Sequence, residues 1–448
     1  MSIRPHLYTL YTEDFAQQRH AYYASMREHY GHVAPVEIAP GAHGYLVISP
    51  EAARTVQHDT DTWTRNPSVW ASRQPADSPV LGMLGYRPNP LFTDGAEHDR
   101  YRRVVTDVLS WVEPHFLRDA ARQVADGLID QMIEKMATDG TVDLVRDFTS
   151  PFPSILLNRL FGQDDSRAEK LVRALERLMD AGPDGAAANA EFEQYITELI
   201  ASKRAHPSRD ITTLIIQHPA QLSEEEVLHA LTLLVAAGKE PSTHLMGNTF
   251  YELATDNALY SQAVNGAIDL MPAIEQALTN RPPMANYGAH YPRRAVTLYG
   301  QPIAAHSLVL VSFEAVGISL RAAASGCPRS GGKQHIAWSH GPHTCPASDI
   351  ATTMAVTALT QAIQRLPDLE LTVPAAELRL RTGPFQHALA ALPARFAPVT
   401  VTTRGEYSWD FNPFMTSTPS TRTDATSPAS PPNCDGWETW LPSNSPAA

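Results

Sequence analysis

The amino-acid sequence predicts a mainly α-helical protein with a few small β-sheets, that is, an α+β fold. Helical periodicity fills most of residues 97–254, in segments of roughly 12 to 30 residues. A second long helix is predicted over residues 347–365, and Pro367 stops it. The strand-like runs are short and lie outside the long helical stretch, so they do not alternate with helices. This arrangement excludes a Rossmann fold and an α/β barrel.

The first elements in chain order are a helix and two strands. Residues 14–31 form an amphipathic helical pattern, and strand patterns follow at residues 32–38 and 45–48. Pro40 and Gly41 mark the turn between the two strands. Within the helical stretch, breaks are predicted at Pro151-Phe-Pro153, at residues 182–185 and at His206-Pro207.

The most informative helix begins at Ser223. Ser223 and Glu226 have the spacing of a capping box, in which each side chain bonds the backbone amide of the other residue. Apolar residues continue towards Leu253, which gives a helix of about 30 residues, well above the usual length. Pro241 lies in its middle, where it removes one backbone donor and clashes with an earlier carbonyl. We therefore expect a long central helix with a kink.

The sequence after the central helix predicts short strands and then a tail. Strand patterns occur at residues 295–298, 307–311, 370–373 and 397–402. Gly300-Gln-Pro302 is the expected turn between the first two of them. Residues 403–448 are rich in Ser, Thr, Pro and Asn, which is typical of disordered segments. We therefore expect one folded domain over residues 1–402, followed by a disordered tail.

Composition and charge exclude several classes of function. The 448 residues are 43% hydrophobic and carry a net charge of −13, without a basic tract. Nucleic acid and anionic membrane surfaces are therefore not expected as partners. Three cysteines, Cys327, Cys345 and Cys434, cannot build a disulfide framework and suit a reducing cytoplasm. The sequence contains no run of about 18 apolar residues and no Walker, Gly-x-Ser-x-Gly or His-Glu-x-x-His motif.

One stretch, residues 338–347, carries a distinctive chemical arrangement. A loop with glycine and proline presents Cys345 directly before the second long helix. A helix N-terminus favours the thiolate and lowers the pKa of the thiol. Trp338 can shield the sulfur, and His343 can reach an anionic group beside it. Two alternatives remain open: a buried cysteine that acts as a small hydrophobe, and a zinc site of His340, His343 and Cys345, which lacks a fourth ligand.

This stretch resembles the haem-binding loop of the cytochrome P-450 superfamily. The family pattern is Phe-Gly-x-Gly-x-His/Arg-x-Cys-x-Gly/Ala, and here Trp338 stands for Phe and Ser339 for the first Gly. The resemblance implies that Cys345 is the thiolate ligand of the iron in haem b. It also implies the family fold, a triangular helical domain around a buried haem with a long, kinked central helix. The resemblance covers about residues 5–401.

Further positions resemble the family's contacts to the haem. Residues 94–103 are similar to a family helix that binds the haem propionates, and His98 and Arg102 are four residues apart on one face of it. His290 aligns with a propionate-binding Arg or His of the family, counted back from the turn at Gly300. Apart from the family, these charges would be interpreted as solvated helix surface. The resemblance assigns the cofactor contacts to His98, Arg102, His290, Trp338, His343 and Ala237.

The central helix resembles the oxygen-activating segment of the family but departs from it at one position. The family pattern Ala/Gly-Gly-x-Glu/Asp-Thr-Thr appears at residues 237–243 as Ala-Gly-Lys-Glu-Pro-Ser-Thr. Pro241 occupies the place of the threonine that helps to deliver protons, and proline donates no hydrogen bond. Ser242 replaces the lost hydroxyl only if the kink rotates it into the groove. The catalytic candidates implied by the resemblance are Gly238, Glu240, Pro241 and Ser242.

A second departure lies in the helix predicted at residues 271–280. The Glu-x-x-Arg motif of the family aligns there with Gln276-Ala-Leu-Thr279, so neutral groups replace a charge-assisted pair. The segment 320–334, which precedes the cysteine loop, also lacks the pattern of the usual third partner. Loss of a whole network costs less than loss of one buried partner. The chain resembles an atypical actinomycete group that lacks this motif.

The resemblance implies a cytoplasmic, monomeric haem-thiolate monooxygenase. It would oxidise a small hydrophobic substrate with O₂ and with electrons from a ferredoxin and its reductase, and its proton delivery would be atypical. Pro241 and the missing Glu-x-x-Arg motif leave alternatives open. One is a haem-binding protein with lost or altered oxygenase activity that acts as a sensor or an interaction partner. The others are a peroxide-driven oxygenase and a scaffold without haem.

Overall fold

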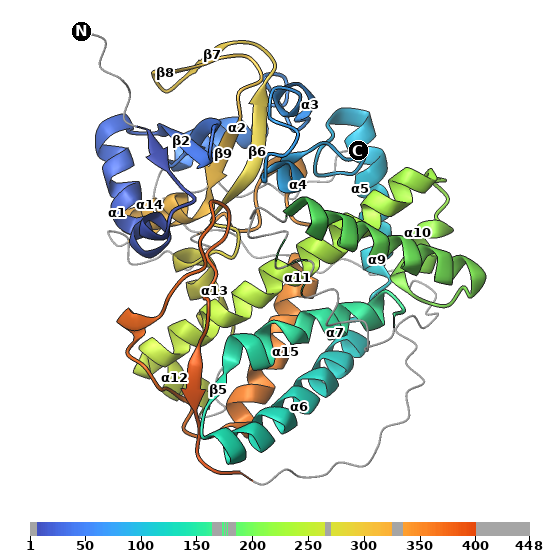
Figure 1. The fold of residues 1–448 in the computed structure, drawn as a ribbon, viewed down its shortest axis with the longest axis vertical. Coiled ribbons are helices and arrows are strands. Elements are labelled where there is room, and N and C mark those ends of the chain that lie inside the picture. Colours follow the sequence, from blue (N-terminus) through green and yellow to red (C-terminus); the bar gives the residue numbers. More distant parts are fainter. Residues whose placement is uncertain are drawn as a thin grey trace, which may run out of the picture. The chain divides into compact units, whose positions relative to one another are not determined.

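A long central helix, α11 (Glu224–Thr255), runs through the middle of the fold (Figure 1). The computed structural model describes residues 7–163, 173, 175, 177, 185–264, 270–324 and 335–399, which all belong to one unit of the chain. The helices α7 (Pro151–Leu160) and α15 (Ser348–Arg365) contact α11, and α6 (Pro114–Asp139) contacts both of them. The predicted mainly helical fold with small sheets is confirmed.

The other helices surround this group or support the sheets (Figure 1). They are α1 (Glu13–Tyr30), α2 (Pro50–His58), α3 (Ser68–Ala71), α4 (Leu81–Leu84), α5 (Gly95–Ser110), α9 (Gly185–Ala205), α10 (Ile211–Ile216), α12 (Asn257–Val264), α13 (Met271–Asn280) and α14 (Phe313–Ala324). Among the helices of the described residues, none has the length and apolar character needed to cross a membrane.

Three small sheets lie beside the helices. The largest has the strand order β1-β2-β3-β9-β6-β4, with strands Tyr8–Thr9, Val33–Ala39, Ala42–Val47, Val309–Ser312, Asn286–Pro292 and Trp63–Thr64. The other two sheets are β10 (Glu370–Leu371), β11 (Pro393–Arg395) and β5 (Val142–Asp143), and β7 (Val296–Leu298) with β8 (Gln301–Ile303). Because β3 pairs parallel with β9, the largest sheet joins the N-terminal hairpin to a segment more than half the chain away.

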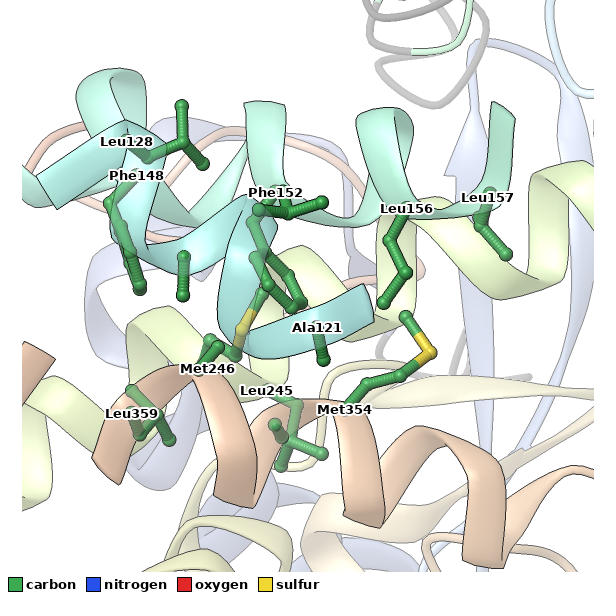
Figure 2. Close-up of a cluster of buried hydrophobic side chains, with 14 of the residues drawn as sticks. Ala121, Leu128, Phe148, Phe152, Leu156, Leu157, Leu245, Met246, Met354 and Leu359 are labelled. Carbon is green, nitrogen blue, oxygen red and sulfur yellow. The ribbon is translucent and has the colours of Figure 1, made fainter. Parts of the chain in front are cut away.

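The main hydrophobic core lies between α6, α7, α11 and α15, as Figure 2 shows. Phe148 and Phe152 approach from the α7 side, and Leu245 and Met246 approach from α11. Met354 of α15 completes the contact from below in this view. All five side chains are buried, and full burial of such a side chain stabilises the fold by about 1.5–3 kcal/mol.

The capping box predicted for α11 is present. The Glu226 amide donates to Oγ of Ser223 at 3.2 Å, and the Ser223 amide donates to Oε2 of Glu226 at 2.8 Å. The helix then runs unbroken through Pro241 to Thr255, so packing outweighs the local cost of proline. A bend of the helix axis at Pro241 stays a prediction.

One expected turn and one expected helix break are found close to the predicted residues. The turn predicted at residues 300–302 is shorter, because Gln301 and Pro302 belong to β8 and the reversal occurs at Tyr299 and Gly300, which have positive φ angles. Pro151 begins α7, where the missing amide of proline needs no partner.

The strand predicted at residues 397–402 is not found in the half of it that the structure describes. Residues 397–399 form no strand, and the last strand of the described residues is β11, which pairs with both β10 and β5. The tail predicted at residues 403–448 lies outside the described residues, as do residues 400–402, Cys327 and Cys434.

A buried polar network connects α1, α14 and the segment after β10. The fully buried carboxylate of Glu314 lies 3.0 Å from Nδ1 of His387 and 3.5 Å from Nη1 of Arg19. Nε2 of His387 lies 3.1 Å from Nη1 of Arg281, which can only donate. Nε2 therefore accepts, and Nδ1 carries the hydrogen that is donated to Glu314. Burial lowers the pKa of His387 to about 4. The charge of Glu314 opposes this shift, and the charges of Arg19 and Arg281 add to it.

This neutral histidine predicts a loss of stability in acid. Between about pH 6.5 and pH 4 the unfolded chain binds a proton at His387 that the folded protein does not, so stability falls as the pH is lowered. His387→Gln should reduce the slope of unfolding free energy against pH there by up to about 1.4 kcal/mol per pH unit. Urea unfolding at several pH values measures the slope, with the exposed His115→Gln as the control. An unchanged slope in His387→Gln would contradict the assignment.

Candidate functional site

Cys345 lies at the end of a tightly folded loop just before α15. Its amide donates to the Trp338 carbonyl at 2.8 Å, and Oγ1 of Thr344 donates to the Gly341 carbonyl at 2.8 Å. Gly341 has a φ of +72°, and an added Cβ would lie 2.5 Å from the Gln57 carbonyl oxygen. Glycine is therefore required there, because any side chain would push the loop away from α2.

The pKa expectation for Cys345 is wrong. Burial raises the pKa of this thiol, while the Ala347 amide and the charge of Arg102 only partly oppose that effect. Desolvation of the thiolate therefore outweighs the contribution of the helix N-terminus. A bound metal cation would supply the missing stabilisation of the thiolate. Among the described residues no group of three or more metal-ligating side chains lies together, so the zinc alternative gains no support.

A cluster of arginine and histidine side chains adjoins this loop; we call it the Arg–His cluster. Its members are Arg65, His98, Arg102, His290 and His343. Nη2 of Arg102 donates to the carbonyl of Thr344 at 2.6 Å, directly before Cys345. The rings of His98 and His343 have centroids 4.4 Å apart, and Nη1 of Arg65 lies 3.2 Å from Nε2 of His290. The structure thus brings together the predicted propionate contacts His98, Arg102 and His290 with the predicted cofactor contact His343, and it adds Arg65.

The Arg–His cluster has more donors than acceptors. Burial lowers the pKa of His290 well below its ordinary value and that of His343 to about 4, so both are neutral at pH 7. Asp94 acts on Arg65 through its charge, and its oxygen lies 3.8 Å from Nε2 of His343. The guanidinium of Arg102 donates to the Thr344 carbonyl, and Nδ1 of His98 lies 3.2 Å from the exposed carboxylate of Asp99. Nε2 of His98 is buried without a hydrogen-bond partner in the described part of the chain. The unpartnered Nε2 of His98 and the two guanidinium groups beside it fit a pair of carboxylates, such as the propionates of haem.

One face of α11 is accessible although the flanking residues are buried; we call it the open face. It consists of Leu233, Ala237 and Pro241, with Leu234 and Gly238 at its edge, where Leu234 packs against the main core and Gly238 approaches Leu157. Their spacing of three or four residues places them on one side of the helix. Ala237 is exposed, whereas Lys239, Glu240 and Ser242 on other faces are buried. This accessible apolar stripe lies beside buried faces of the same helix and is available to a cofactor or an apolar substrate.

Glu240 is fully buried among cationic groups. Nζ of Lys239, itself fully buried, bonds Oε1 of Glu240. Nε2 of His244 lies 3.3 Å and Nη1 of Arg381 3.8 Å from Oε2. Burial alone would raise the pKa of Glu240, but these charges hold it well below its ordinary value. The carboxylate is therefore ionised at neutral pH.

The predicted hydroxyl replacement lies apart from the open face. Ser242 is 5% exposed, and the neighbouring Thr243 has a buried Oγ1 without a hydrogen-bond partner in the described residues. Pro241 lies on the open face and carries no hydroxyl. The replacement of the family threonine by Ser242 therefore stays a prediction that needs a rotation of this turn.

The helix α13 shows how the missing Glu-x-x-Arg pair is compensated. Nε2 of Gln276 donates to Oε2 of Glu252 at 2.7 Å, and Nε of Arg281 lies 3.2 Å from Oε1 of the same carboxylate. Oγ1 of Thr279 bonds the carbonyl of Glu275 in its own helix. The carboxylate that anchors α13 is therefore Glu252 of α11, and it replaces the carboxylate that the family carries on α13 itself. The neutral Gln276 can donate to it.

Sequence reasoning missed several of these partners. Arg65, Glu252 and Arg381 give no local signal, because each acts on residues far away in the chain. His244 had a signal, since it follows Glu240 by four residues on one helix face.

Comparison with known proteins shows similarity along most of the chain. A protein named cytochrome P-450 107B1 from Saccharopolyspora erythraea is 29% identical over 409 residues, which cover 86% of this chain and 96% of that protein. The cytochrome P-450 monooxygenase PikC from Streptomyces venezuelae is 27% identical over 401 residues, 86% of this chain and 92% of PikC. No protein-family model matches the chain.

Solved structures show the same similarity in three dimensions. A testosterone-bound CYP154C4 from a Streptomyces species superposes with a TM-score of 0.80 at 26% identity. The superposition covers 87% of this chain and 98% of that structure.

Proposed function

We infer that the chain belongs to the cytochrome P-450 superfamily, whose cofactor is haem b, and on this premise we propose that it is a haem-thiolate monooxygenase of small, largely hydrophobic substrates. The observation that carries the proposal is Cys345, held by the Trp338 carbonyl and directly next to the Arg102 contact of the Arg–His cluster. A ligand for iron and a group of donors for propionates therefore lie next to one another.

The residues present would hold haem at two ends. Cys345 would ligate the iron, with Trp338 beside the sulfur, and the Arg–His cluster would bind the propionates. The open face of α11, with Ala237 and Gly238, would lie against the cofactor and leave apolar space for the substrate. When bound, the haem would supply the cleavage chemistry of the O–O bond, because its thiolate ligand pushes electron density onto the iron.

We propose that Glu240 is ionised between turnovers and transfers protons by taking up one proton and releasing it again. Lys239, His244 and Arg381 keep its carboxylate ionised. Nε2 of His244 lies close to Glu240 and 3.1 Å from Oε1 of Gln386, and because both are acceptors it carries the hydrogen. Lys239 and His244 are thus two buried donors beside Glu240, and the carboxylate can take a proton from either of them. Pro241 gives no hydroxyl for the last transfer, so delivery depends on water or on the substrate.

The test is product formation by the holoenzyme with a ferredoxin, a reductase and a panel of small hydrophobic compounds. We expect oxygenated product that depends on O₂ and on both redox proteins, together with a low yield of product per electron. Exchange of the redox proteins for hydrogen peroxide tests the peroxide-driven alternative. Consumption of electrons without product across the panel, in protein with intact thiolate-ligated haem, would contradict the proposal.

Pro241 favours a second candidate function. A haem protein without a proton-delivering hydroxyl binds a diatomic ligand but activates O₂ poorly. It would serve as a sensor or as an interaction partner. If Cys345→Ala abolishes a phenotype of the host and Glu240→Gln leaves that phenotype intact, this second function is the correct one.

A further inference from the structure

We propose that His335 and Glu275 form a latch that positions the cysteine loop for thiolate ligation. The inference rests on the proposed haem-thiolate function and adds two positioning residues to it. Nε2 of His335 lies 2.9 Å from Oε2 of Glu275, which is on α13. The loop segment before Cys345 is therefore tied to a helix on which the family's Glu-x-x-Arg pair is replaced by Gln276 and Thr279.

The hydrogen positions of this latch follow from its neighbours. Nδ1 of His335 accepts the backbone amide of Ala337 at 3.1 Å. Because Nδ1 accepts, Nε2 carries the hydrogen and donates it to Glu275. The side chain of His335 is 1% exposed and that of Glu275 is 32% exposed, so the contact is screened from water on one side. A charge-assisted bond in such surroundings is stronger than one on the open surface.

Short backbone bonds connect His335 with Cys345. The Ser339 amide donates to the Ile336 carbonyl at 2.8 Å, and the Cys345 amide donates to the Trp338 carbonyl at 2.8 Å. Ile336 is buried, and Trp338 packs against the main core. A shift of His335 would therefore move the turn whose carbonyl holds the Cys345 backbone.

The other end of the latch is firmly held. The end of α13 is anchored on α11 through the bonds from Gln276 and Arg281 to Glu252. Gly317 of α14 packs so closely on α13 that an added Cβ would lie 2.8 Å from the Thr279 carbonyl oxygen. Glu275 thus presents its carboxylate from a helix that cannot easily move, as a positioning residue requires.

The experiment follows the reduced, carbon-monoxide-bound spectrum of full-length holoprotein. The measured quantity is the rate at which the thiolate-type Soret band converts to the neutral-ligand type under mild urea, with total haem and circular dichroism recorded in parallel. We expect His335→Ala and Glu275→Ala each to accelerate conversion about tenfold. Glu275→Gln keeps an acceptor for Nε2–H and should stay within about twofold of the wild type. The double variant should be no faster than either single variant, because one contact is lost in each case.

A second histidine of the chain gives a matched control. Nδ1 of His218 accepts the Ala220 amide at 3.1 Å, and Nε2 lies 3.4 Å from a carboxylate oxygen of Asp107 on α5. It has the geometry of His335 but lies in another part of the chain. His218→Ala should convert at the wild-type rate. If it accelerates conversion as much as His335→Ala, the effect is general destabilisation and the latch is refuted.

The remaining outcomes separate this inference from the proposed function. Wild-type rates in both alanine variants would overturn the latch and leave the haem-thiolate function intact. Absence of a thiolate-type band in the wild type would overturn the proposed function itself. If His335→Ala does not fold, the partly exposed Glu275→Ala, compared with Glu275→Gln, decides alone: equal conversion rates of these two variants would refute the latch.

Discussion

Glu240→Gln should lower product formation about 100-fold and also destabilise the protein by about 3 kcal/mol. The activity loss follows because an amide cannot accept and release the proton. The stability loss has a different cause: Lys239 is fully buried, and the substitution leaves its ammonium without the carboxylate that it bonds. Product per electron measures the first effect, and urea unfolding of the same holoprotein measures the second.

The double variant Lys239→Met/Glu240→Gln separates these two effects. Met has nearly the length of the Lys stem, and no buried charge is left at this pair. Stability should return to within about 1 kcal/mol of the wild type, whereas product formation should stay as low as in Glu240→Gln. A double variant with restored activity would show that the charge of Glu240 serves only the fold.

Pro241→Thr should raise the yield of product per electron several-fold and raise the stability by about 1–3 kcal/mol. The hydroxyl would stand on the open face of α11, where the proline now offers no donor. The added backbone amide would restore a helix hydrogen bond. Product and consumed electrons, determined together, give the yield.

Pro241→Ala is the control for the hydroxyl. It restores the same backbone amide but adds no side-chain donor, so it should gain stability without gaining yield. An equal gain in yield from both substitutions would assign the defect to the helix backbone. No gain from either would favour a protein that no longer depends on oxygen activation.

The elements that the sequence predicts correctly are those decided by neighbours in the chain. Ser223 and Glu226 are three residues apart, and their capping box places the start of α11 correctly. The α13 boundaries at Met271 and Asn280 also agree with the prediction. The described part of the strand predicted at residues 397–402 forms no strand, and β11 before it is defined by pairing with β5, about 250 residues earlier. Pairing over such distances leaves no periodicity in a short segment.

The candidate site shows the same division. The pattern around Cys345 predicts the loop, and the spacing of His98 and Arg102 predicts a shared helix face, which α5 provides. The charge environment depends on distant residues: Arg381 acts on Glu240 from 141 positions away, and His335 reaches back to Glu275. The lowered thiol pKa expected at the helix N-terminus is wrong because burial, a tertiary property, outweighs the local dipole.

The central claim is that Cys345 binds haem iron as a thiolate on a framework without the Glu-x-x-Arg pair. The most direct measurement is the reduced, carbon-monoxide-bound absorption spectrum of the purified holoprotein, beside that of Cys345→Ala. We expect a thiolate-type Soret band in the wild type and its loss in the variant. A neutral-ligand band in freshly prepared wild-type protein, or an unchanged band in Cys345→Ala, would contradict it.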